Sequence, residues 1–135
     1  MGDVHVTGFD HLVLRVRDVE RSLAWYVDEL GLTPERVDEW RRGAVLFPSV
    51  RIDATTIIDL LPATDAEVPD AAPGRERRNV DHLCLVVDPV DLAAVVASGR
   101  FDVVGGPTRL YGAQGEGEGI YVHDPDGNVV ELRHY

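Results

Sequence analysis

An internal repeat limits the possible folds of this chain more than any other feature of its sequence. The segment 10–16 reads DHLVLRV, and the segment 81–87 reads DHLCLVV. The repeat places His11 and His82 71 positions apart. Each copy is a short run of apolar and β-branched residues, which is typical of a buried strand, and each is followed by an Asp-led helical pattern.

A second similarity closes each half of the chain, in the same order. IIDL at 57–60 corresponds to VVEL at 129–132, which places Asp59 and Glu131 72 positions apart. Two similarities at nearly the same offset indicate a duplicated module of about 65 residues.

Length and turn signals predict one domain over residues 1–135, with a first module at about 8–61 and a second at about 80–135. The segment 62–79 between them is rich in Pro, Ala, Asp and Arg and has no period, which predicts a linker. The sequence pattern of each module predicts a strand, a helix and three further strands. The predicted fold class is α+β, with two tandem βαβββ modules.

The element boundaries follow from hydrophobic periods and from capping and turn residues. In the first module we predict a strand over 9–16, a helix from an Asp18 cap to Gly31, and strands over 35–40, 44–49 and 53–61. In the second we predict a strand over 80–87, a helix from Pro89 to Gly99, and strands over 101–104, 120–123 and 129–135.

Charge and composition exclude several functions. The chain has 24 acidic and 13 basic residues and a net charge of −11, so we expect no nucleic-acid partner. All 13 bases are arginine, and the lack of lysine excludes Schiff-base and P-loop chemistry. No apolar stretch approaches the about 20 residues of a membrane span. The N-terminus also lacks the features of a signal peptide, so we expect a cytoplasmic protein without a membrane partner.

Four metal-capable side chains stand in the middle of apolar strands: His11, Asp59, His82 and Glu131. An ionised carboxylate in such a place costs several kcal/mol unless it is paired or ligated. A hydrogen-bonded core histidine and a glutamate paired with an arginine are the alternatives. The equivalent placement in both modules favours one site of His11, His82 and Glu131, with Asp59 as a weaker fourth candidate. Such a donor set suits a borderline or hard divalent ion.

The motifs around these residues resemble the vicinal oxygen chelate superfamily, which includes glyoxalase I, bleomycin-resistance proteins, fosfomycin-modifying enzymes and extradiol dioxygenases. The first block is H-x-x-L-x-V at 11–16, S-x-x-W-Y at 22–26 and L-G-L at 30–32. The second is I-Y-x-x-D-P-D-G at 120–127, followed by Glu131. The resemblance implies a curved mixed sheet around a metal cleft. It matches His11, His82 and Glu131 to the metal ligands and Asp59 to the variable fourth one.

The resemblance also implies a cofactor and a class of activity. The cofactor is one divalent metal ion (Fe, Mn, Ni, Co or Zn) that chelates neighbouring oxygens of a small-molecule substrate, and the protein is expected to be a homodimer. The reaction stays open between a lyase or isomerase of glyoxalase type and a dioxygenase. The alternative is a metal-free drug-binding protein of the bleomycin-resistance type, although such proteins generally lack the ligand set that this chain keeps.

Four further residues are predicted to shape the site. Arg15 stands where glyoxalases have an arginine that meets an anionic substrate; a surface arginine is the alternative. Gln114 falls in the stretch where extradiol enzymes place an acid–base histidine. Glutamine cannot shuttle a proton, which argues against ordinary catechol cleavage, and we assign Gln114 to substrate binding. Tyr121 and His123 share a strand face and, with Asp59, are the candidate catalytic residues, unless Tyr121 only packs and His123 only caps the turn.

Overall fold

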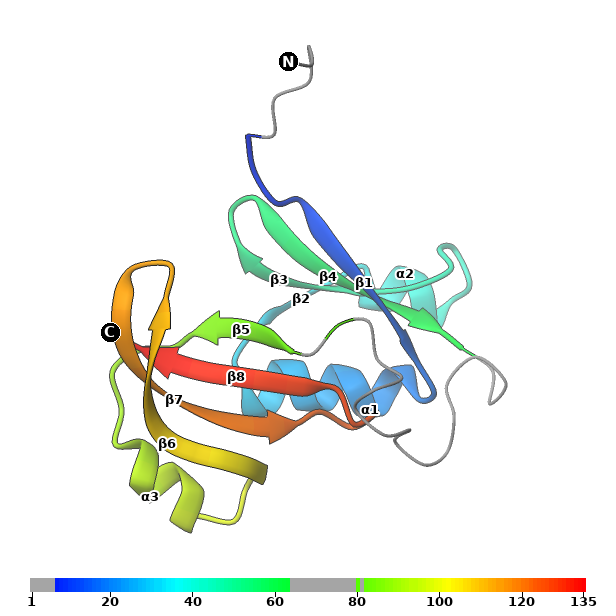
Figure 1. Cartoon of the computed structure of the whole chain (residues 1–135). Helices are drawn as coiled ribbons and strands as arrows, with labels where there is room; N and C mark the ends of the chain where they lie inside the picture. The colour runs from blue at the N-terminus through cyan, green and yellow to red at the C-terminus, as the bar shows by residue number, and fades with distance from the viewer. Residues whose placement is uncertain (1–6, 64–79, 81) are drawn as a thin grey trace. The chain divides into compact units, whose positions relative to one another are not determined.

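The computed structural model describes residues 7–63, 80 and 82–135 (Figure 1). The chain divides into two compact units, Met1–Asp70 and Ala71–Tyr135. Each unit contains one four-stranded mixed sheet, so the predicted α+β class with tandem modules is confirmed. The predicted linker lies outside the described residues from position 64 to 79, as does Asp81 at the start of the second copy of the repeat.

The first unit forms the sheet β1-β4-β3-β2, in which β1 is parallel to β4 and the other neighbours are antiparallel. A π-helix, η1, continues α1 directly. The elements in chain order are β1 (His11–Val16), α1 (Val19–Ala24), η1 (Trp25–Glu29), β2 (Thr33–Glu35), α2 (Val37–Arg41), β3 (Ser49–Asp53) and β4 (Thr56–Pro62).

The helix of the first unit begins and ends where the sequence predicts. The Asp18 side chain caps it by accepting a hydrogen bond from the Arg21 N–H at 3.0 Å. Gly31 follows η1 with a φ of 74°, a left-handed conformation that favours glycine. The apolar face packs on β1, β3 and β4 in a core of Val16, Val19, Leu23, Tyr26, Val50, Ile58 and Leu60.

The predicted strand over 35–40 is wrong, because the extended chain stops at Glu35 and α2 begins at Val37. Arg36 adopts a left-handed φ of 59°, which interrupts the strand. Its carbonyl accepts a hydrogen bond from the Trp40 N–H at 2.9 Å and so closes a helical turn. Val37 and Trp40 both pack against the core, and their spacing of three residues suits a helix rather than a strand. The next strand also starts later than predicted, at Ser49.

The second unit forms the sheet β5-β8-β7-β6, in which β5 is parallel to β8. Its helix begins one turn later than Pro89, because the Asp91 side chain caps it by accepting from the Ala94 N–H at 3.1 Å. The elements are β5 (Leu83–Val86), α3 (Leu92–Ala97), β6 (Asp102–Gly112), β7 (Gly115–His123) and β8 (Val129–His134).

The hairpin of β6 and β7 is much longer than the predicted strands over 101–104 and 120–123. Its strands have 11 and 9 residues. Glycines between 105 and 119 weaken the strand pattern in the sequence, because glycine has low strand propensity. No helix in the described part of the chain is long and apolar enough to cross a membrane.

Candidate metal site

Glu131 lies at the centre of the candidate site in the second unit. Strand β8 runs between β5 and β7, and its register places Glu131 opposite Cys84 on one side and Tyr121 on the other. Side chains of register partners project from the same face of a sheet. The Glu131 side chain is buried, with 5% of the residue exposed, and its Oε2 lies 3.2 Å from His82 Nε2.

Two neutral donors surround this carboxylate. The Tyr121 ring meets the His82 ring edge-on, with 5.3 Å between the ring centroids. Burial, with a further contribution from Glu131, raises the pKa of Tyr121 above its ordinary value, so the phenol keeps its proton at neutral pH. Burial and the Glu131 charge also raise the pKa of Cys84 to about 11, so this side chain is a thiol.

The other oxygen of the carboxylate has an ion-pair partner but no hydrogen bond. Glu131 Oε1 lies 3.2 Å from Arg133 Nε. Both atoms are buried, and neither makes a hydrogen bond within the described residues. A buried carboxylate oxygen without a hydrogen bond calls for a physical reason. The other oxygen, Oε2, lies beside His82 Nε2, and carboxylate oxygens and imidazole nitrogens are donor atoms of the kind that divalent metals bind.

The first unit holds its corresponding groups differently. Asp59 is buried on the middle strand β4, opposite Val13 on β1 and Ser49 on β3. It accepts a hydrogen bond of 2.6 Å from Ser49 Oγ. His11 lies two positions before Val13 on β1, so it shares the face of Asp59, but its Nδ1 pairs with Asp10 Oδ2 at 2.6 Å.

The Asp10 contact affects both the charge and the orientation of His11. The hydrogen bond that the Asp10 carboxylate accepts raises the pKa of His11, and the charge of Asp59 adds to this. A carboxylate on Nδ1 also fixes the imidazole so that Nε2 is the nitrogen left for a metal, the usual arrangement for a metal-binding histidine. Within its own unit, His11 is therefore paired with Asp10.

The structure therefore brings His82, Tyr121 and Glu131 together in the second unit and places His11 and Asp59 on one sheet face in the first. Within either unit, no group of three His, Cys, Asp or Glu among the described residues lies close enough to hold a metal ion. The ligand set of His11, His82 and Glu131, with Asp59 as the fourth, draws on both units and stays a prediction.

The remaining predicted residues take different places. His123 lies on the face of Tyr121, and its Nδ1 is 3.0 Å from Asp102 Oδ2. Arg15 is exposed on β1, on the same face as His11. Gln114 lies in the turn between β6 and β7, seven positions before Tyr121, which is roughly 20 Å of strand. Within the second unit, the structure does not bring Gln114 to the Glu131 cluster.

Cys84 and Arg133 have no predicted role in the sequence, although both contact the candidate site. Strand alternation places Cys84 on the face of His82 and Arg133 on the face of Glu131. This alternation is the sequence signal that could have identified both residues as neighbours of the site. It does not predict the register of β5, β7 and β8, and it is this register that places Cys84 directly beside Glu131.

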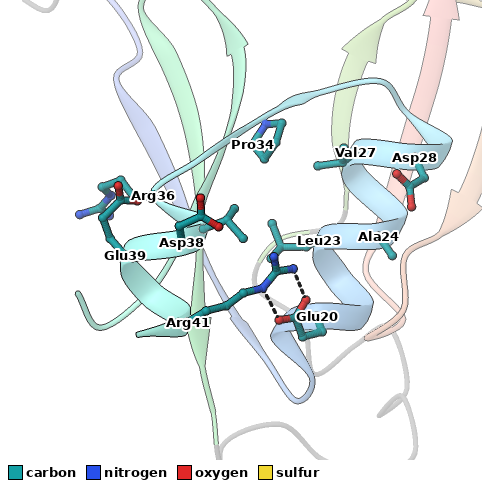
Figure 2. Close-up of a pocket in the computed structure, with 11 residues that line it drawn as sticks. Glu20, Leu23, Ala24, Val27, Asp28, Pro34, Arg36, Asp38, Glu39 and Arg41 are labelled. Carbon is teal, nitrogen blue, oxygen red and sulfur yellow. Dashed lines mark hydrogen bonds and ion pairs between the residues drawn. The ribbon is translucent and has the colours of Figure 1, made fainter. Parts of the chain in front are cut away.

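A separate hollow of about 500 Å³ lies in the first unit between the helical segment α1–η1 and α2 (Figure 2). Leu23, Val27 and Pro34 are among its apolar lining residues. At its rim the Arg41 guanidinium donates two hydrogen bonds of 2.7 Å to the Glu20 carboxylate. None of the predicted ligands lines this hollow, so it is distinct from the candidate metal site.

The sequence is similar to a protein family and to a bacterial protein. The family model of the Glyoxalase/Bleomycin resistance protein/Dioxygenase superfamily matches residues 8–132. Virulence protein STM3117 of Salmonella typhimurium is 29% identical over 129 residues, which cover 93% of this chain and 83% of the relative.

Two solved structures show the same fold. The structure of a glyoxalase/dioxygenase from Nostoc punctiforme matches with a TM-score of 0.77 at 23% identity, covering 99% of this chain and 97% of the other. The structure of TnmS3, an antibiotic binding protein from Streptomyces sp. CB03234, matches with a TM-score of 0.63 at 23% identity, covering 97% and 98%.

Proposed function

The chain belongs to the glyoxalase/bleomycin resistance protein/dioxygenase superfamily, and from that premise we propose that it is a divalent-metal-dependent enzyme. Its proposed substrate is a small metabolite that binds through two neighbouring oxygen atoms. The observation that carries the proposal is the contact of 3.2 Å between His82 Nε2 and Glu131 Oε2, beside a buried Glu131 Oε1 that makes no hydrogen bond within the described residues.

The proposed ligands are His11, His82 and Glu131, with Asp59 as a candidate fourth. Three features support this set. His82 and Glu131 already converge, the Nδ1 of His11 is held by Asp10, and the carboxylate of Asp59 shares the sheet face of His11. When bound, a divalent ion (Fe, Mn, Ni, Co or Zn) would act as a Lewis acid that polarises a substrate oxygen.

The chain supplies the groups that move protons and hold charge. Tyr121 stays protonated, because burial and Glu131 raise its pKa, so its O–H can donate to a substrate oxygen beside His82. His123 has its Nδ1 held by Asp102 at 3.0 Å, which leaves Nε2 to accept or return a proton. Arg15 is the proposed contact for an anionic part of the substrate.

The class of reaction follows from whether Asp59 binds the metal. Its hydrogen bond from Ser49 already occupies Oδ1. A site without Asp59 is a triad of two histidines and one carboxylate, which suits iron(II) and oxygen. A site with Asp59 has four protein ligands and suits proton transfer next to a chelated carbonyl, the chemistry of a lyase or isomerase.

Metal content tests the proposal directly. Protein purified without chelator should contain about one divalent metal per subunit, measured by plasma mass spectrometry, and apo-protein should bind Co²⁺ in a calorimetric titration. The variant His82→Ala should lose this binding. His134→Gln, a change to another histidine of the second unit, should keep it. Undiminished metal content in His82→Ala would contradict the proposal.

Activity assays then separate the two reaction classes. The iron(II) form should be tested with catechols under air, and the nickel, cobalt and zinc forms with the hemithioacetal of methylglyoxal. Turnover of the hemithioacetal favours the lyase or isomerase. Rapid cleavage of a plain catechol would favour the dioxygenase and show that Gln114 does not prevent ring cleavage.

A metal-free drug-binding protein is the second candidate function, and exposed apolar side chains support it. Val13 and Val86 lie on the strand faces of His11 and His82 and are 45% and 60% exposed. Apolar surface of this kind suits the body of a drug molecule. Tight calorimetric binding of bleomycin by metal-free protein, with no activity in either assay, would favour this function over the enzyme.

We also propose a homodimer located in the cytoplasm. The superfamily resemblance and the exposed apolar residues Val13 and Val86 support self-association. Light scattering at micromolar concentration should give twice the mass of the 14.9 kDa chain. A monomeric mass would contradict the dimer without affecting the proposed ligands of the second unit.

A further inference from the structure

We propose that Arg133 is a positioning residue that fixes the orientation of the Glu131 carboxylate toward His82, and that glycines of the β6–β7 hairpin make the space that its side chain needs. The inference rests on the proposed function only in naming a metal as the eventual ligand of Glu131. Its geometric part concerns the second unit alone.

The Arg133 side chain is fixed at its far end. The residue is buried, with only 3% exposed. Its Nη2 donates to the Leu110 carbonyl at 2.5 Å, and its Nη1 donates to Tyr135 Oη at 3.2 Å. The guanidinium also lies 5.1 Å from the centre of the Tyr135 ring. Because the planar guanidinium is rigid, these contacts determine where the remaining nitrogen, Nε, is held.

The fixed guanidinium places Nε beside the carboxylate. Arg133 Nε lies 3.2 Å from Glu131 Oε1, while the other oxygen, Oε2, lies 3.2 Å from His82 Nε2. One carboxylate oxygen is thus directed to the arginine and the other to the histidine. The Nε–Oε1 contact supplies charge compensation, and Oε1 makes no hydrogen bond within the described residues.

Glycines occupy the positions that the arginine passes. A Cβ atom at Gly112 would lie 1.5 Å from Arg133 Nη1, and one at Gly119 would lie 3.0 Å from Glu131 Oε1 and 3.3 Å from Arg133 Cβ. Neither glycine has a positive φ. A side chain at either position would therefore compete with Arg133 or Glu131 for space, whereas the backbone conformation alone would admit one. This gives a physical reason for part of the glycine-rich sequence between 112 and 119, which the proposed function does not otherwise explain.

The first unit offers a natural comparison for this role. The position equivalent to Arg133 is Leu61, 72 residues earlier. There the carboxylate of Asp59 bonds to Ser49 at 2.6 Å, and His11 pairs with Asp10. In the second unit, which has Arg133, the Glu131 carboxylate contacts His82; in the first unit, which has leucine at the equivalent position, the Asp59 carboxylate bonds to Ser49 instead.

The first experiment uses metal-free protein and reads the histidine ring directly. Long-range ¹H–¹⁵N spectra report the ring nitrogens of His82, and Glu131→Gln defines the signals of a broken pair. Arg133→Met removes the charge and donors, whereas Gly112→Ala displaces the side chain and leaves the arginine chemically intact. Both should shift the His82 signals toward those of Glu131→Gln. Arg109→Met, which removes an exposed arginine paired with Glu116 at 3.5 Å, should leave them unchanged.

The second experiment measures Co²⁺ affinity by calorimetry. Loss of a group that orients a metal ligand typically weakens binding about 10- to 100-fold, and we expect this for Arg133→Met and Gly112→Ala. Arg109→Met should stay within about twofold of the wild type, because surface changes remote from the ligands have little effect. A wild type that binds no Co²⁺, with His82 signals that still shift in the variants, would refute the proposed metal function and leave the positioning role standing.

A conservative variant keeps the proposal testable if Arg133→Met does not fold. Arg133→Lys retains the charge but replaces the rigid guanidinium, with its Nε beside Glu131, by a flexible ammonium, so it should fold and give intermediate His82 signals and intermediate Co²⁺ affinity. Circular dichroism establishes that each variant is folded. Folded variants at position 133 with wild-type His82 signals and wild-type affinity would overturn the inference.

Discussion

The two units place a carboxylate at the same position of the same kind of sheet and then use it differently. In the first unit, Asp59 on the middle strand accepts a hydrogen bond from Ser49 Oγ at 2.6 Å. In the second unit, Glu131 on the middle strand meets His82 at 3.2 Å. The two sheets have the same strand order, so the difference comes from side chains and not from topology.

Reach and neighbours account for the difference. Glutamate has one more methylene than aspartate, which adds roughly 1.5 Å of reach. On the adjacent antiparallel strand, the partner of Asp59 is the short donor Ser49, while the partner of Glu131 is the larger Tyr121. The duplicated scaffold thus preserves the place of a functional group, while the neighbouring side chains decide what the group binds.

The largest expected difference between the units is in metal affinity. Glu131→Gln and Asp59→Asn are matched isosteric changes at equivalent positions. Glu131→Gln should weaken Co²⁺ binding by about 100-fold or more, because it removes the ligand charge beside His82. Asp59→Asn should weaken it by about tenfold or less, because Ser49 already engages Asp59. Calorimetric titration measures both, and equal losses would show a true four-residue site.

The next effect concerns the stability that Ser49 gives to the first unit. Both Ser49 and Asp59 are buried, so Ser49→Ala leaves a buried carboxylate short of a donor. We expect a loss of about 2 kcal/mol in the free energy of unfolding, measured with urea. The control is Thr55→Ala, which removes an exposed hydrogen bond of 3.3 Å from the Thr55 hydroxyl to Asp53 and should cost less than about 0.5 kcal/mol. Equal losses in the two variants would refute a special role for the Ser49–Asp59 bond.

The third effect uses the single cysteine, Cys84, as a probe of the second unit. Burial and the Glu131 charge raise the pKa of this thiol to about 11. Its alkylation rate with iodoacetamide should therefore rise through pH 8–10, roughly tenfold per pH unit, without reaching a plateau. Glu131→Gln should move the curve to lower pH, because it removes a negative charge that disfavours the thiolate. A plateau near pH 9 in the wild-type protein would contradict the raised pKa of the Cys84 thiol beside Glu131.

The smallest effect is the titration of His11 in the first unit. The Asp10 hydrogen bond raises the pKa of His11, so Asp10→Asn should lower that pKa toward its ordinary value near 6.5. A histidine pKa that is higher in the folded state than in the unfolded state makes the free energy of unfolding depend on pH. The protonated pair contributes fully below the ordinary histidine pKa, and the contribution disappears as the pH rises through the elevated pKa. An NMR titration of the His11 ring measures the shift, and an unchanged pKa in the variant would contradict the contact.

Much of the fold could be predicted from the sequence, because capping residues, hydrophobic spacing and the internal repeat indicate the elements locally. The Asp18 cap, the helical spacing and the glycine stop predict the first helix, and the repeat predicts two equivalent modules. Two predictions of secondary structure were wrong for physical reasons. Arg36 adopts a left-handed conformation and starts a helix that the sequence did not predict. Glycines such as Gly119, which lie close to other side chains, weaken the strand pattern and obscure the length of the β6–β7 hairpin.

The sequence alone indicates which sheet faces carry His11, Asp59 and Glu131, because alternation along a strand follows from backbone geometry. It could not determine the partners of these groups. The folded chain is needed to show that Asp59 accepts a hydrogen bond from Ser49 and that Glu131 lies between His82 and Arg133. Partner choice depends on strand register and on differences of one or two ångströms in side-chain reach, and residues distant in the chain set both.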